Sequence, residues 1–122
     1  MTTISTNLQA VRARIAAAAQ LAGRAVEDIR LLAVSKTFPP ERIREAAQAS
    51  QIAFGENYLQ ESLGKIAALA DLGLEWHFIG PLQSNKTRPV AEHFAWAHGV
   101  ERLKIAERLA EARGAERPPL QV

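Results

Sequence analysis

The chain has 122 residues, no cysteine, 23% charged residues and a formal net charge of +2. This length allows one ordinary domain and argues against two. A hydrophobic share of 48% combined with the small net charge argues against intrinsic disorder. The absence of cysteine excludes a disulfide-stapled module and a Cys-based zinc site, and it suits a reducing compartment.

The amino terminus carries no recognisable targeting segment. Residues 1–7 are polar, and Arg12 and Arg14 interrupt the alanine-rich stretch that follows, so a continuous apolar segment is missing. No run approaches the ~20 apolar residues of a membrane span. Basic residues alternate with acidic ones in 41–45 and 101–104, which indicates solvated helix faces. We therefore expect a cytoplasmic domain without nucleic-acid or membrane partners.

Hydrophobic periodicity predicts helices alternating with short strands. Apolar residues recur at helical spacing from Ile4 to Ala22, which predicts a helix that ends near Gly23. Short apolar runs then predict buried strands over 29–35, 51–55, 74–79 and 94–98. A helical segment follows each strand. The first opens at 39–40, the second follows residue 55, and the others run over about 84–91 and about 101–113. Residues 118–122 are typical of the approach to a fifth strand.

This alternation predicts an α/β protein whose parallel strands are joined by right-handed crossovers. Two architectures fit. One is a complete five-stranded doubly wound sheet, and the other is a (β/α)8 barrel cut at about half of its usual ~250 residues. The pattern alone slightly favours the doubly wound sheet, because complete domains are commoner than halves.

Reactive groups in parallel α/β folds lie beyond the carboxyl ends of the strands. Lys36 follows the first predicted strand and, by the two-residue period, shares an apolar face with Leu32 and Val34. Burial among apolar residues lowers the pKa of an amine, and a neutral amine can condense with an aldehyde to a Schiff base. On position alone, a lysine that ends a strand and reaches water is the commoner case.

The other candidates have ordinary structural explanations. Asn57 stands three residues before a glutamine, as in a capping box, and Ser84 suits a helix N-cap. His77 lies inside a strand and is expected to be a hydrogen-bonded core or rim histidine. Three histidines without a His-x-x-x-His pair do not predict a zinc site. Glu56 and Glu101 could form an acid–base pair, but no spacing singles them out.

The doubly wound alternative fails at its expected functional positions. The chain has neither a glycine-rich phosphate loop nor a Gly-x-Ser-x-Gly elbow. A receiver-type domain needs a carboxylate after a central strand, whereas the first strand here ends in Ser35–Lys36 and the third in Ile79–Gly80. A flavodoxin-type site needs a hydroxyl- or glycine-rich loop where this chain has Phe38 and two prolines.

Three strings in order carry a family resemblance: LLAVSKT at 31–37, FGENYLQE at 54–61 and WHFIGPLQSNK at 76–86. Together they resemble the pyridoxal phosphate homeostasis protein family, whose fold is similar to the amino-terminal barrel of alanine racemase. The resemblance extends from the first helix to Val122. It implies a partial (β/α)8 barrel, with residues 1–122 as the amino-terminal part: a helix and about four β/α units. The carboxyl-terminal half would then be absent from the chain.

The resemblance also implies a function and two site residues. Members bind pyridoxal 5′-phosphate (PLP); Lys36 matches the Schiff-base lysine, and Asn57 matches a position at the cofactor's edge. The family is regarded as a PLP carrier or buffer without established turnover, so we expect neither a catalytic residue nor a metal. The alternative is a PLP-dependent racemase-like enzyme, which would need a second acid–base group opposite Lys36.

Two departures from the family pattern accompany the resemblance. Residues 98–101 read His-Gly-Val-Glu where members tend to show a serine and then an aspartate, and the later Ser- and Gly-rich phosphate-binding segments are absent. A half-barrel would also leave an unpaired strand edge and an open apolar face. We therefore expect the chain to self-associate or to need its carboxyl-terminal half.

Overall fold

The computed structural model describes residues 3–122. Helix α1 (Ile4–Leu21) begins after Thr3, whose hydroxyl accepts a hydrogen bond of 3.0 Å from the Thr6 amide and caps the helix. The chain turns away at Gly23, which has a left-handed φ of 68°, so the predicted helix end is confirmed. No helix among these residues combines the length and apolar character needed to cross a membrane.

Four parallel strands form one sheet in the order β1–β2–β3–β4. They are β1 (Ala33–Val34), β2 (Ala53–Glu56), β3 (Glu75–Phe78) and β4 (Trp96–Ala97). All four lie within the predicted apolar runs or extend them by one residue. A parallel bridge between Trp96 and Gln121 then places the end of the chain beside β4, where the sequence predicts the approach to a fifth strand.

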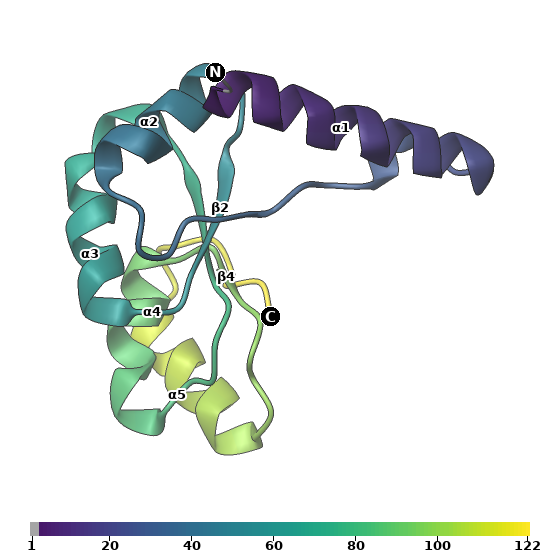
Figure 1. The fold of residues 1–122 in the computed structure, drawn as a ribbon. Helices are drawn as coiled ribbons and strands as arrows, with labels where there is room; N and C mark the ends of the chain where they lie inside the picture. The colour runs from purple at the N-terminus through teal and green to yellow at the C-terminus, as the bar shows by residue number, and fades with distance from the viewer. Residues whose placement is uncertain (1–2) are drawn as a thin grey trace.

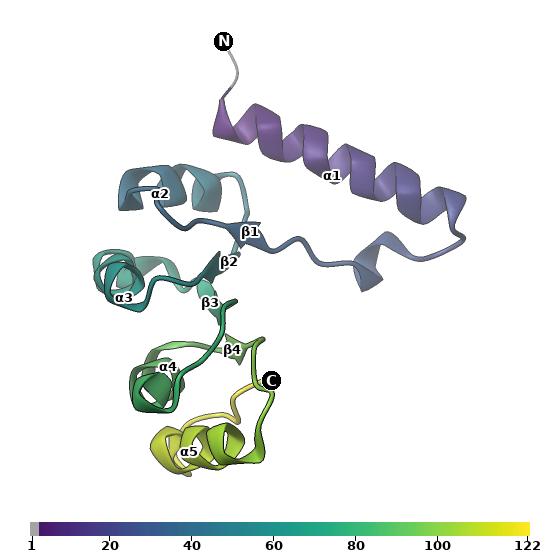
Figure 2. The ribbon, with the colours of Figure 1, turned by 60° about the horizontal axis from the view of Figure 1, so that its bottom comes forward.

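The helices that connect the strands lie on one side of the sheet. They are α2 (Pro40–Gln48), α3 (Leu59–Ala68), α4 (Thr87–His93) and α5 (Leu103–Arg113). Short 3-10 turns occur at η1 (Val26–Asp28), between α1 and β1, and at η2 (Ala70–Leu72) and η3 (Ser84–Lys86). Figure 2 shows α2 to α5 in a row along the same face, and α1 near the β1 end of the sheet (Figure 1). A doubly wound sheet carries helices on both faces, so residues 3–122 do not adopt that arrangement.

The hydrophobic core fills the space between the sheet and these helices. Phe54 of β2 meets Trp76 of β3 at a ring distance of 5.8 Å, and Phe78 packs edge-on against Phe94 at 5.5 Å. The helices and their ends contribute the most buried aliphatic side chains: Ile43, Leu69, Val90, Ile105 and Leu109. We call this helix-covered side of the sheet the outer face.

The opposite side, which we call the inner face, is defined by one row of paired strand residues: Val34, Gly55, His77 and Trp96. Within residues 3–122 no row of helices covers it (Figure 2). Val34 is consequently 51% exposed although it belongs to the apolar run of β1. The two-residue period of strands therefore turns Val34 away from the core, whereas His77 in the same row is only 6% exposed and stacks with Trp96 and His98.

Candidate functional site

Lys36 lies in a tight turn directly after β1. The Phe38 amide donates a hydrogen bond of 3.1 Å to the Ser35 carbonyl, and Thr37 has a left-handed φ of 68°, as at the third position of a type II turn. A non-glycine residue rarely adopts this conformation. Lys36 is exposed, as in the commoner case of a lysine that ends a strand and reaches water, and it is not buried among apolar residues. The reason is the open inner face, which leaves Val34 half exposed as well.

Asn57 occupies the corresponding position after β2. Because Val34 pairs with Gly55, the two-residue period carries the inner-face row on to Lys36 and Asn57 at the carboxyl edge of the sheet. The Asn57 Oδ1 atom is buried and has no hydrogen-bond partner among residues 3–122. Buried amide oxygens are rarely left unpaired, so this atom is a candidate acceptor for a ligand. Asn57 also lines a cavity of about 490 Å³ at this edge.

The capping roles that the sequence suggests for Asn57 and Ser84 are both wrong. Helix α3 has Tyr58 as its N-cap, and no side chain caps it. The helix therefore starts one residue too late for Asn57 to reach its first turn. Ser84 is the first residue of η3, where its carbonyl accepts a hydrogen bond of 2.9 Å from the Thr87 hydroxyl.

Two glycines draw the ends of β2, β3 and β4 together at this edge. A Cβ atom on Gly99 would lie 2.4 Å from the carbonyl oxygen of Gly80, and one on Gly80 would lie 3.0 Å from the Cβ of Asn57. The first contact is with backbone, so Gly99 cannot carry a side chain unless a strand end moves. Sequence reasoning missed this role, although a glycine directly after a predicted strand was its signal.

A chain of polar side chains crosses the inner face from the start of β3 to the end of β4. Glu75 Oε1 accepts a hydrogen bond of 2.7 Å from Arg30 and lies 2.7 Å from His77 Nε2. His77 Nδ1 lies 2.9 Å from His98 Nε2, and the His77 ring stacks on Trp96 at 5.4 Å. The expectation of a hydrogen-bonded histidine at position 77 is confirmed.

The pKa shifts of Glu75 and His77 show which atoms of this polar row carry protons. Burial lowers the pKa of His77 by more than the hydrogen bond to Glu75 raises it, so the imidazole is neutral at pH 7. Burial alone would raise the pKa of Glu75, but the hydrogen bonds from His77 and Arg30 outweigh it and hold that pKa below its usual value. His77 Nε2 therefore carries the proton toward the carboxylate, and Nδ1 accepts from His98 Nε2–H.

A buried ion pair lies on the outer face, behind the turn that follows β1. Lys65 Nζ of α3 lies 3.0 and 3.1 Å from the two carboxylate oxygens of Glu56, and 2.7 Å from Glu61 Oε1. It also donates a hydrogen bond of 2.8 Å to the Ser35 carbonyl. The Ser35 hydroxyl donates to Glu56, and the Thr37 amide donates to Glu61 at 2.8 Å. Sequence reasoning missed this network entirely.

The same contacts separate Glu56 from Glu101. Glu56 is fully buried toward the helices while Glu101 is exposed after β4, so the acid–base pair considered for them does not form. No group of three His, Cys, Asp or Glu side chains that could hold a metal ion occurs within residues 3–122.

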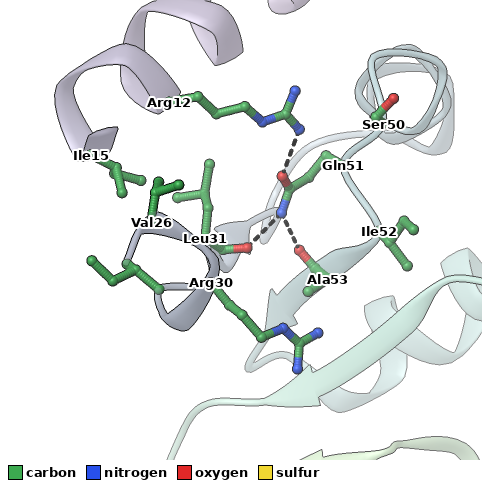
Figure 3. Close-up of a pocket in the computed structure, with 10 residues that line it drawn as sticks. Arg12, Ile15, Val26, Arg30, Leu31, Ser50, Gln51, Ile52 and Ala53 are labelled. Atoms are coloured by element: carbon green, nitrogen blue, oxygen red, sulfur yellow. Dashed lines mark hydrogen bonds between the residues drawn. The ribbon is translucent and has the colours of Figure 1, made fainter. Parts of the chain in front are cut away.

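A cavity of about 470 Å³ lies at the opposite end of the sheet, between α1, η1 and the starts of the strands (Figure 3). The Gln51 amide nitrogen donates to the carbonyls of Leu31 and Ala53 at 2.8 and 2.9 Å, and its oxygen accepts from Arg12 at 3.0 Å. Arg12 also donates to the Ala49 carbonyl at 2.8 Å. These groups use their hydrogen-bonding atoms on one another and link α1 to the sheet, so we assign them a structural role.

Comparison with known proteins gives a consistent relationship. No protein-family model matches the chain. It is 63% identical over 122 residues to the pyridoxal phosphate homeostasis protein of Pseudomonas aeruginosa, and 58% identical over 125 residues to that of Escherichia coli K12. The resemblance to the pyridoxal phosphate homeostasis proteins is confirmed. Both alignments cover 100% of this chain and 53% of the relative, so the chain spans about half the length of the curated pyridoxal phosphate homeostasis proteins it matches.

Solved structures extend the relationship to the fold. PipY of Synechococcus elongatus PCC7942, solved both with and without PLP bound, is 45% identical with a TM-score of 0.69, over 80% of this chain and 46–47% of PipY. A protein from Bifidobacterium adolescentis, described as an unknown protein, is 32% identical with a TM-score of 0.76, over 88% of this chain and 48% of that one. The parallel α/β arrangement is therefore shared with these proteins.

Proposed function

We propose that this chain forms part of a PLP-binding homeostasis protein and that Lys36 holds the cofactor. The observation that carries the proposal is the turn after β1, which presents an exposed Lys36 at the carboxyl edge of the sheet, where the register of β1 and β2 continued by two residues assigns it to the same row as Asn57. The names of the homologues and the PLP-bound structure of PipY support it.

The residues at this edge suit PLP. The exposed primary amine of Lys36 and the unpaired Oδ1 of Asn57 provide a nucleophile and a hydrogen-bond acceptor of the kinds such a cofactor needs. When bound, PLP supplies an aldehyde carbon with which an amine condenses to a Schiff base with loss of water. Asn57 would hold a donor at the cofactor's edge, and the turn would direct the Lys36 amine.

We also infer that the sheet belongs to a (β/α)8 barrel of which residues 1–122 are the amino-terminal part. Three features support this inference: the sequential strand order, the placement of α2 to α5 on one face, and the bridge from Trp96 to Gln121. Closure of such a barrel would cover the inner face and enclose Lys36 and Asn57. The open face and the edge of the sheet beyond Gln121, which pairs with β4, are accordingly where we expect self-association or the other half of the barrel.

We further propose a carrier role without turnover, in the cytoplasm. The homologues' description as homeostasis proteins supports the first part, and the cysteine-free composition suits the second. The racemase-like alternative makes a different prediction, because it requires an acid–base group opposite Lys36 to exchange the α-proton of amino acids. Sustained, Lys36-dependent exchange in deuterated water would favour that enzyme.

Reductive trapping tests the central proposal. The chain is incubated with PLP, reduced with borohydride and mapped by mass spectrometry, with Lys36→Ala as the test variant and Lys104→Ala, an exposed lysine of α5, as the control. We expect the adduct on Lys36, its loss in Lys36→Ala and its retention in Lys104→Ala. Labelling spread evenly over the lysines, or unchanged in Lys36→Ala, would refute the proposal.

A further inference from the structure

The peptide groups on either side of Lys36 are both held by side chains of α3. The carbonyl of Ser35, just before Lys36, accepts a hydrogen bond of 2.8 Å from Lys65 Nζ. The amide of Thr37, just after it, donates a hydrogen bond of 2.8 Å to Glu61 Oε1. Lys65 and Glu61 are themselves an ion pair at 2.7 Å, one helical turn apart. One ion pair thus fixes the backbone on both sides of the reactive amine.

Glu56 of β2 contacts this pair from the sheet and holds Lys65 in place. Both of its carboxylate oxygens contact Lys65 Nζ, at 3.0 and 3.1 Å, and one of them also accepts from the Ser35 hydroxyl. Glu56 has no exposed surface and Lys65 has only 4%. Lys65 therefore cannot swing into solvent, and Ser35 is held through its carbonyl and its hydroxyl together.

A gain in the free energy of unfolding does not by itself account for this buried network. A buried ion pair loses so much solvation that apolar residues of similar size are often equally stable in its place. Thr37 adds a left-handed conformation that a β-branched residue adopts only when its surroundings impose it. Buried charges and an unfavourable backbone conformation thus meet at the single turn that presents Lys36.

We propose that Lys65 and Glu61, anchored by Glu56, are positioning residues that fix the turn at Lys36 and hence the direction in which its amine leaves the sheet. The inference rests on the proposed function for the identity of the group that meets the amine. The fixing of the turn itself is a property of this chain alone, so it can be tested without PLP.

Amide hydrogen exchange at Thr37, followed by NMR, tests the fixing of the turn. Glu61→Ala removes the acceptor, Glu61→Gln restores an oxygen at the same place, and Glu92→Ala is a matched control. Glu92 also forms an i,i+4 ion pair, with Arg88, and its side chain is 33% exposed against 37% for Glu61. A hydrogen bond to a charged group contributes enough that its loss should speed exchange at Thr37 about tenfold or more in Glu61→Ala. We expect Glu61→Gln to recover most of the protection and Glu92→Ala to leave it unchanged.

The consequence for the amine is measured on the same variants by two reactions. Borohydride trapping of PLP on Lys36 should slow several-fold in Glu61→Ala, whereas acetylation of Lys36 by acetic anhydride should not change, because the amine is exposed in any case. Unaltered exchange at Thr37, or equal slowing of both reactions, would overturn the positioning role. If PLP labels no particular lysine in the unaltered chain, the proposed function fails, and Thr37 exchange alone decides the present inference.

Discussion

Replacing Lys65 by methionine separates the two charges of the buried ion pair with little change of volume. Methionine keeps an unbranched side chain in the same channel, so the substitution removes the ammonium group and leaves no large cavity. The Glu56 carboxylate, with no exposed surface, then retains the Ser35 hydroxyl as its hydrogen-bond donor, and the Ser35 carbonyl loses its contact of 2.8 Å.

The expected destabilisation is large. Removing one partner of a buried pair costs about 3–5 kcal/mol, because an uncompensated charge stays in the interior. Domains of this size unfold with about 5–15 kcal/mol, so Lys65→Met should lose roughly a fifth or more of the total. With a urea m-value of about 2 kcal/mol/M, the unfolding midpoint should fall by about 2 M.

Urea unfolding followed by circular dichroism measures this loss, and a double-mutant cycle identifies its cause. Glu56→Leu alone should also destabilise the chain, since it leaves the Lys65 ammonium buried without its main partner. The double variant Glu56→Leu/Lys65→Met should be more stable than either single variant, because neither charge is left unpaired. A loss below about 1 kcal/mol for Lys65→Met, or a double variant that shows the sum of both losses, would refute the reasoning.

Two further predictions concern the inner face and the glycines. The pKa of His77 lies below 6.5 in the folded chain because burial disfavours the charged ring, so the unfolded chain binds the proton more readily. Stability should therefore fall as the pH drops below 6.5, and His77→Gln should flatten this dependence in urea unfolding at pH 7.5 and 5.5; an unchanged slope would contradict the assignment. Gly99→Ala should lower the free energy of unfolding by about 1–3 kcal/mol, because the new Cβ would meet the Gly80 backbone. Gly64→Ala is the control: a Cβ there on α3 meets nothing within 4 Å and should raise the free energy of unfolding by up to about 1 kcal/mol. Equal effects of the two substitutions in thermal unfolding would argue against the close packing at Gly99.

The strands and the long helix could be predicted because their signals are local. Apolar runs such as 51–55 and 74–79 mark strands that are covered on one face, and Gly23 marks a helix end, so hydrophobic spacing alone locates these elements. Strand order and the placement of the helices are not local properties. The choice between a doubly wound sheet and a barrel therefore depended on motifs, since periodicity is the same in both.

The ion pair behind Lys36 illustrates what the pattern leaves out. Glu56 shares a strand face with Phe54, which by alternation places a carboxylate in the core and demands a buried cationic partner. That partner, Lys65, stands nine residues later on α3, at a spacing with no helical or strand signature. The need for a cation could thus be predicted, whereas its source depended on how the helix packs. The predicted capping role of Asn57 was wrong for a similar reason: α3 begins one residue later than expected, and the sequence pattern does not locate a helix start to within one residue.

The two-residue period of the strands separates the buried supporting residues from the candidate site residues at this edge of the sheet. Ser35 and Glu56 lie toward the helices and are held there by Lys65, while alternation assigns their successors Lys36 and Asn57 to the row that continues the inner face. A one-residue slip in either strand would exchange the two sets, burying the amine and exposing the carboxylate. The buried network therefore fixes register as well as the turn. Under the proposed function the Lys36 amine must meet one aldehyde carbon, and it gains from such a support because its own side chain is long and flexible whereas the backbone that carries it is not.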